Sequence, residues 1–220
     1  MDDEGAMDIP FVPVTYRDET VFAAEGSFDG RLRFQAGDTV PLREVAPLLS
    51  SDVRGKVLIC DTDSINARGF DSDVMKHCRV KGSDTWLMTF IGDADDLFDA
   101  FNYTAERVLA PLNFISPSDL TDIASISEGF IPVIPVVRGR FTGNSYPKDP
   151  CKILEELSES GLYQVALLDL DNSLGRDQWE AMVEEHPATI PMFNRYGVSE
   201  EHAQASVRIV PLRLGRYGHR

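Results

Sequence analysis

The sequence predicts an α/β protein, namely a closed (β/α)8 TIM-type barrel that is built from two similar half-barrels, with its last helix missing. A short apolar run that ends in Asp-x-Asp occurs twice, in Val57–Ile65 and in Val165–Ser173, and both aspartates recur 108 residues later. Other segments also recur in the same order. Apolar runs alternate with helical patterns along the chain, which is typical of parallel strands covered by helices.

Three further pairs of segments support the duplication. Their offsets shrink from 122 to 100 residues, as loops of different length would cause, and chance would rarely preserve their order. The pairs are Ile9–Val14 with Ile131–Val136, Thr85–Met88 with Thr189–Met192, and Val108–Leu112 with Ile209–Leu212. We therefore expect eight strands in two sets of four.

Near-continuous apolar runs predict the strands. They cover residues 9–16, 56–61, 84–90, 107–112, 130–137, 164–169, 188–194 and 207–214. Amphipathic or capped segments predict the helices. They cover residues 41–50, 70–79, 93–103, 118–126, 151–160, 177–185 and 199–205. In the third helix Asp93 can cap the N-terminus, and Leu97, Phe98 and Phe101 share one face.

We expect one domain over residues 1–220, because this length suits a single barrel. Residues 1–8 are expected to be disordered, and turn signals predict a β-hairpin inserted over residues 20–40. The segment Arg138–Pro150 is the long loop of the chain. It is either a lid, in which Phe141 and Tyr146 cover a ligand, or a surface loop.

The composition restricts the function. The chain has 220 residues and a formal net charge of −15, which argues against nucleic acid and anionic membranes as partners. No apolar run or leader pattern points to a membrane span or to export, so we expect a cytoplasmic protein. The three cysteines favour neither a disulfide framework nor a zinc site. We expect no metal and no cofactor, and no lysine ends a strand to form a Schiff base.

The repeated segments resemble the histidine-biosynthesis barrels (HisA/HisF-like), which are the phosphoribosylformimino-AICAR ribotide isomerase and the cyclase of imidazole glycerol phosphate synthase. Val57–Ile65 is similar to the strand-two segment of that family, and Leu168–Gly175 is similar to strand six. Tyr196–Ser199 resembles the phosphate loop after strand seven, and Leu214–Arg216 resembles the segment after strand eight. The resemblance implies a barrel that handles phosphorylated metabolites.

The chain departs from that family where the resemblance implies catalytic aspartates. Strand one ends in Thr15-Tyr16 and strand five ends in Val137-Arg138, so neither carries the carboxylate. Acid–base isomerisation needs two such groups within hydrogen-bond reach, so we do not expect the histidine-pathway isomerase itself. The paired phosphate-loop glycines are reduced to Gly92 and Gly197. One phosphate site is expected to survive, at Gly197–Ser199 and Gly215.

In such barrels ligands bind at the carboxyl ends of the strands. We expect Asp61 and Asp169 to be catalytic, facing each other across the mouth. The alternatives for the two Asp-x-Asp pairs are a structural role, in which they cap strand-end N–H groups and pair with arginines, or ligation of a divalent metal. The expected ligand-binding residues are Asn113, Arg138, Asn194, Arg195, Gly197, Ser199, Arg213 and Gly215. The arginines among them either grip an anionic group or pair with rim aspartates.

Two functions follow from these expectations. The first is a barrel enzyme, an isomerase or lyase, that binds a small phosphorylated or carboxylated metabolite. The second is a non-catalytic barrel that binds a metabolite or a protein. A mouth filled by side chains would favour the second. Because no helix is predicted after strand eight, the seam between strands eight and one is expected to carry a homodimer contact or another partner.

Overall fold

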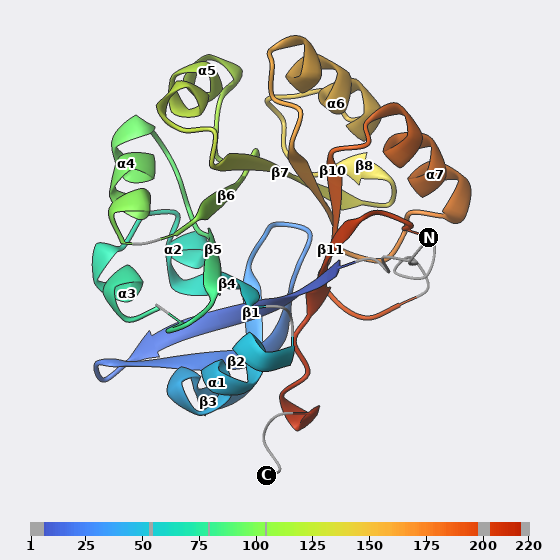
Figure 1. Ribbon diagram of the computed structural model, residues 1–220. Coiled ribbons are helices and arrows are strands. Elements are labelled where there is room, and N and C mark those ends of the chain that lie inside the picture. The colour runs from blue at the N-terminus through green and yellow to red at the C-terminus, as the bar shows by residue number, and fades with distance from the viewer. Residues whose placement is uncertain (1–6, 53–54, 79, 104, 198–202, 217–220) are drawn as a thin grey trace.

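Eight parallel strands close into a barrel in the computed structural model, which describes residues 7–52, 55–78, 80–103, 105–197 and 203–216 (Figure 1). Around the ring they are β1 (Met7–Arg17), β4 (Lys56–Asp61), β5 (Asp84–Met88), β6 (Arg107–Pro111), β7 (Phe130–Val137), β9 (Val165–Asp169), β10 (Thr189–Phe193) and β11 (Val207–Pro211). The ring closes because β11 also pairs with β1 in parallel. The predicted fold class is confirmed.

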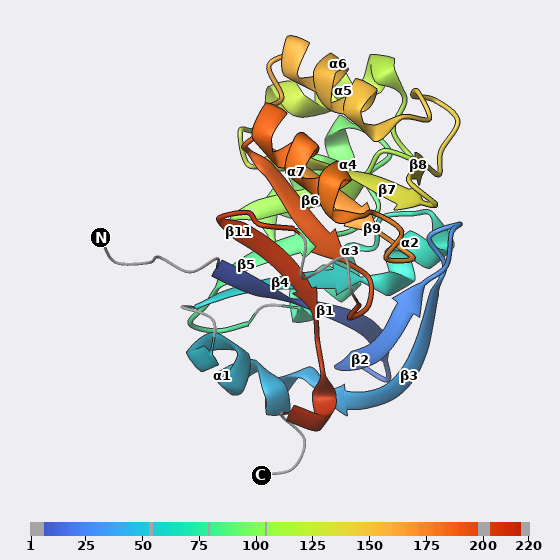
Figure 2. The same ribbon diagram turned by 90° about the vertical axis from the view of Figure 1, so that its right-hand side faces the viewer.

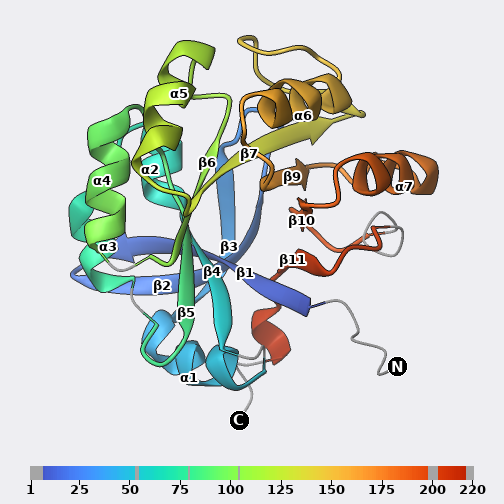
Figure 3. The same ribbon diagram turned by 45° about the horizontal axis from the view of Figure 1, so that its top comes forward.

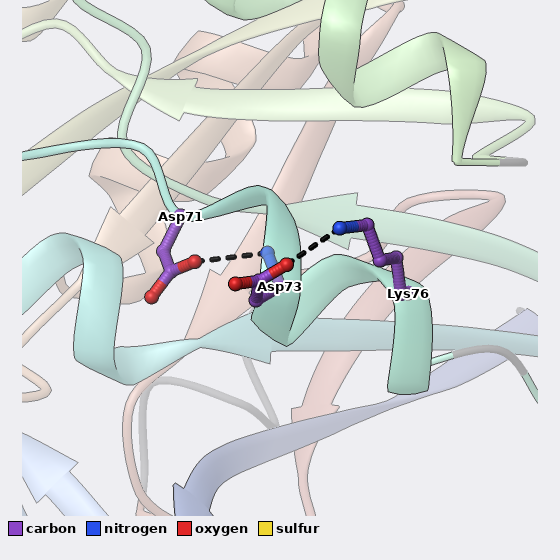
Figure 4. A network of polar contacts seen from close by, with 3 residues as sticks. All are labelled: Asp71, Asp73 and Lys76. Atoms are coloured by element: carbon purple, nitrogen blue, oxygen red, sulfur yellow. Dashed lines mark hydrogen bonds and ion pairs between the residues drawn. The ribbon is translucent and has the colours of Figure 1, made fainter. Parts of the chain in front are cut away.

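Helices lie outside the ring, as the tilted view in Figure 3 shows. They are α1 (Leu42–Asp52), α2 (Thr62–Ala67), α3 (Ser72–His77), α4 (Ala94–Asn102), α5 (Pro117–Ile126), α6 (Pro150–Glu159) and α7 (Arg176–Glu185), and η1 (Leu214–Arg216) is a short 3-10 turn. The helix expected over residues 70–79 is shorter, since Asp71 caps α3 through the amide of Asp73 and Asp73 pairs with Lys76 at 2.5 Å (Figure 4). No described helix is long and apolar enough to cross a bilayer.

The two half-barrels have the same register between their neighbouring strands. Equivalent residues face each other at each strand pair in both halves: Val14 with Asp61 and Val136 with Asp169, Cys60 with Met88 and Leu168 with Met192, and Met88 with Leu109 and Met192 with Ile209. The two junctions between halves also correspond, as Leu109 with Ile131 and Ile209 with Ile9. The duplication in the sequence is therefore a two-fold repeat of the barrel.

Alternation along each strand divides the core into two layers. Residues such as Phe11, Leu58, Cys60 and Leu168 belong to the cluster inside the barrel. Their neighbours on the same strands belong to the cluster between the barrel and the helices, for example Ile59 and Leu167. A residue's place in this alternation therefore decides whether its side chain faces the barrel axis or the helices.

Each half-barrel continues its first strand into a hairpin. β2 (Thr20–Phe28) and β3 (Phe34–Pro41) pair antiparallel beside β1, where the sequence predicted a hairpin over residues 20–40. The second half has a short counterpart in β8 (Arg140–Phe141), paired with β7. Both turns have two residues with positive φ, Asp18 and Glu19 in the first and Arg138 and Gly139 in the second. The long hairpin thus elaborates a turn that both halves share.

Some local expectations differ from the structure. Met7 and Asp8, expected to be disordered, begin β1 because they pair with Val207 and Arg208 of β11. Phe98 is 60% exposed, since the buried face of α4 is formed by residues such as Leu97. Most of the helix expected over residues 199–205 lies outside the described residues, and residues 203–205 are not helical.

Candidate functional site

The mouth of the barrel is filled by the tip of the β2–β3 hairpin. Phe28, Leu32 and Phe34 are 3%, 1% and 7% exposed and belong to the same cluster as the residues inside the barrel. The ring centroid of Phe28 lies 6.3 Å from that of Phe11, a barrel residue, and 5.1 Å from that of Phe34. Figure 1 shows the tip crossing the middle of the ring, and Figure 2 shows the hairpin rising along one side of the barrel. We call residues 28–34 the cap.

Two asparagines clamp the two ends of the cap. The side-chain amide of Asn194, which follows β10, accepts from the Phe28 amide at 2.7 Å and donates to the Phe28 carbonyl at 2.7 Å. It also donates to the carbonyl of Leu170 at 3.0 Å, and the residue is only 2% exposed. On α2, Asn66 accepts from the Phe34 amide at 2.7 Å. The cap is therefore held by polar contacts as well as by its buried side chains.

The cap has a defined internal conformation. A side-chain oxygen of Asp29 accepts from the amides of Arg31 and Arg33 at 2.8 and 3.0 Å. Leu32, with φ of 57°, turns its side chain into the barrel. At the tip, a Cβ placed on Gly30 would lie 3.5 Å from the side chain of Val137, so the cap reaches β7 on the far side of the mouth from β1.

Asp61, expected to be catalytic, faces the helix layer. It is in phase with Ile59 rather than with Cys60, and it is fully buried. Its carboxylate accepts from the amides of Asp63 and Ser64 at 3.2 and 3.1 Å and from the Ser64 hydroxyl, which makes Asp61 the N-cap of α2. Burial raises the pKa of Asp61 from 3.8 to about 6, against the hydrogen bonds from Ser64, which lower it.

Asp169 has the equivalent place in the second half. It is fully buried, in phase with Leu167, and accepts from the amides of Ser173 and Leu174 at 3.0 and 3.1 Å. Although β4 and β9 lie opposite in the ring, both carboxylates point away from the barrel axis. The structure does not bring Asp61 and Asp169 together across the mouth, because each side chain organises the backbone that follows its own strand.

The second aspartate of each Asp-x-Asp pair ties its strand to the neighbouring one. Asp63 accepts from the Tyr16 amide at 2.7 Å and from the Thr15 hydroxyl at 3.1 Å. Asp171 accepts from the Arg138 amide at 3.1 Å, and Tyr16 and Arg138 are equivalent in the repeat. Of the alternatives that the sequence left open, this geometry favours the structural capping role for the repeated motif.

The expected ligand-binding residues are distributed over the rim. The guanidinium of Arg195 donates to the Asp171 carbonyl at 3.5 Å, and Arg213 lies over the Tyr196 ring at 3.6 Å. The amide of Asn113 donates to Thr142 at 2.8 Å. Arg138, Arg195, Gly197, Arg213 and Gly215 are exposed, whereas Asn194 is the cap clamp and is not open to a ligand. Ser199 lies outside the described residues, so the expected phosphate site is described at Gly197 and Gly215 alone.

The loop expected to be a lid is packed against the outside of the barrel. Phe141 and Tyr146 are 2% and 8% exposed in the helix-side cluster, with edge-to-face rings 5.9 Å apart. The Lys148 ammonium donates to the Gly143 carbonyl and, at 3.1 Å, to Asn144. A side chain at Gly143 would collide with the Phe141 ring. The cap at residues 28–34 covers the mouth instead.

The cap was not predicted from the sequence as a functional element. Phe28, Leu32 and Phe34 surround the turn-forming pair Asp29-Gly30, and large apolar residues are unusual at an exposed hairpin tip. That pattern was the available signal. No group of three or more His, Cys, Asp or Glu side chains within the described ranges is placed to hold a metal ion.

The closed ring of parallel strands and the helices outside it define a TIM-type (β/α)8 barrel. No family model and no curated protein sequence matches the chain. Among solved structures it is similar to the 4-hydroxy-2-oxoglutarate aldolase/2-deydro-3-deoxyphosphogluconate aldolase from TTHB1, with 14% identity and a TM-score of 0.54. The match covers 94% of this chain and 85% of that one. This likeness supports the barrel fold and does not extend to the histidine-biosynthesis family.

Proposed function

We propose that this protein is a non-catalytic barrel that binds its ligand on the outside of a closed mouth. The single observation that carries the proposal is the cap, whose three large apolar side chains occupy the space in which a barrel enzyme would bind its substrate. A fold alone does not assign an activity, so the filled mouth is what supports this candidate function over the other.

The energetics favour a mouth that stays closed. Full burial of a Leu or Phe side chain contributes about 1.5–3 kcal/mol, so withdrawing Phe28, Leu32 and Phe34 together would cost roughly 5–9 kcal/mol. That is comparable to the whole stability of an ordinary domain, about 5–15 kcal/mol. Opening the cap would therefore approach global unfolding, unlike the motion of a substrate-gated lid.

The second candidate is a barrel enzyme, an isomerase or lyase, that acts on a small phosphorylated or carboxylated metabolite. It is favoured by the similarity to a structure titled as an aldolase and by the raised pKa of Asp61, which suits acid–base chemistry. A Schiff-base route is not supported, since the lysines lie away from the carboxyl ends of the barrel strands. They are Lys56 at the start of β4, Lys76 on α3, Lys81 before β5, Lys148 after β8 and Lys152 on α6.

Cys60 tests whether the mouth opens. Its thiol is fully buried inside the barrel beneath the cap, and burial raises its pKa. Modification of the wild-type protein by a thiol reagent can be followed by peptide mapping. Cys151, which is partly exposed, serves as a control in the same molecule. A closed barrel predicts that Cys60 reacts only through global unfolding, with the full urea dependence of the unfolding transition.

The opposite result would favour the enzyme. If Cys60 reacts faster than unfolding allows, and its rate depends only weakly on urea, then the cap opens locally and the interior is accessible. In that case the proposal of a closed, non-catalytic barrel is rejected.

A further inference from the structure

We propose that the closed mouth presents an arginine surface that binds a compact ligand with two anionic groups, either a diphosphate or a polycarboxylate. The surface consists of Arg31, Arg68, Arg138 and Arg195. This inference rests on the proposed function, because it requires the cap to be in place, and it adds the chemical class of the ligand and the residues that hold it.

The four arginines come from distant parts of the chain, and each lies in the cap, contacts it or lies next to a residue that contacts it. Arg68 ends α2 and donates to the carbonyl of Arg31 at 3.4 Å, so these two residues form one side of the surface. Arg138 follows Val137, which Gly30 of the cap approaches. Arg195 donates to the carbonyl of Asp171, and the carboxylate of Asp171 accepts from the Arg138 amide. Arg138 and Arg195 therefore form the other side.

All four side chains are exposed, and none of them forms a salt bridge within the described parts of the chain. The nearby carboxylates of Asp29 and Asp171 accept hydrogen bonds from backbone amides. The guanidinium groups thus keep donors available for an external anion. Arginine is suited to this because its planar group binds phosphate or carboxylate through two parallel hydrogen bonds.

The rest of the molecule limits the size of the ligand. The chain has a formal net charge of −15, so a long polyanion such as a nucleic acid would be repelled beyond the arginine surface. A compact anion would contact the arginines alone. Because the arginines form two pairs on either side of the cap tip, a ligand with two anionic groups can engage both pairs, whereas a single phosphate engages one.

Isothermal titration at low ionic strength tests this inference, with inorganic pyrophosphate and citrate as probes and inorganic phosphate as the single-group comparison. We expect pyrophosphate, citrate or both to bind more tightly than phosphate, and to weaken when salt is added. Arg138→Gln or Arg195→Gln should weaken binding about tenfold each, as expected for the loss of a hydrogen bond between charged groups. Arg43→Gln is the matched control, because Arg43 is exposed on α1 at the other end of β3.

Absence of binding by both pyrophosphate and citrate would overturn the inference, as would an equal loss of affinity in the Arg43→Gln variant. Binding of citrate alone or of pyrophosphate alone would identify which anionic group the surface prefers and would support it. The thiol experiment on Cys60 separates the two proposals. A protected Cys60 without anion binding leaves the closed barrel standing and rejects only this ligand class.

Discussion

Asp61 has a structural role, and its carboxyl group can also take up a proton near neutral pH. Its carboxylate caps α2 and lies out of contact with solvent. Burial opposes its ionisation and raises its pKa, and the negative charge of Asp63 adds to this, so hydrogen bonds compensate the buried charge only in part. The same residue that the sequence marks as a catalytic candidate therefore has a clear effect on stability.

The raised pKa of Asp61 predicts a pH dependence. The folded state holds the Asp61 proton up to about pH 6, whereas the unfolded chain releases it near pH 3.8. Asp61 therefore contributes stability that is present below pH 3.8 and is lost as the pH rises to about 6. The loss is about 3 kcal/mol by linkage. In Asp61→Asn, whose amide can still cap α2, this contribution is removed.

Urea denaturation of both proteins between pH 4 and pH 7.5 measures the effect. The Asn variant should gain free energy of unfolding relative to the wild type as the pH rises, since the other carboxylates contribute equally to both proteins. Parallel stability curves over this range would show that Asp61 does not titrate as inferred.

At the scale of elements, the β2–β3 hairpin is the feature that fills the mouth of the barrel. A close approach within the hairpin shapes it: a Cβ at Gly26 would lie 2.2 Å from the Gln35 carbonyl oxygen. The hairpin carries the cap to the mouth, where Asn194 and Asn66 fix its ends. Asn194 is buried and Asn66 is exposed, so we expect their hydrogen bonds to contribute unequally to the free energy of unfolding.

Asn194→Ala should destabilise the protein by about 2–4 kcal/mol, because it leaves the amide and carbonyl of Phe28 unpaired in a buried place. Asn66→Ala should cost less than about 1 kcal/mol, since Asn66 is exposed and water can replace its contacts. Equilibrium unfolding in urea measures both variants. Similar small effects would indicate that the Asn194 amide does not hold the cap.

The strands and the repeat could be predicted from the sequence, whereas the cap could not. The strands and the repeat were predictable because a buried parallel strand is a local apolar run, and duplication preserves its order. The cap was not, because Asn194 lies 166 residues from Phe28 and their contact depends on closure of the whole ring. The alternation with Ile59 predicts that the Asp61 side chain points toward the helices. The resemblance of the motif to a catalytic one favoured the opposite interpretation, in which Asp61 faces the mouth.

At the scale of the whole molecule, the two halves match in their strands, whereas the burial of these strands differs within the described residues. β9 and β10 are buried along their whole length. In β11, Val207 and Val210 are only partly buried, and Arg208 pairs with Asp8 across the seam at 2.8 Å. Within the described residues, η1 is the element that follows β11. This seam remains the predicted site of a homodimer contact.

Val210→Lys tests that contact, because a charge at this position of β11 would have to be buried in the interface, whereas the free barrel can expose it. We expect sedimentation velocity to show a dimer for the wild type and a monomer for Val210→Lys, with unfolding midpoints that change little. Phe98→Lys on α4 is the matched control, since Phe98 is 60% exposed and α4 lies on another side of the barrel from β11 (Figure 1). A wild-type protein that stays monomeric at high concentration would contradict the prediction, and so would an equal loss of the dimer in both variants.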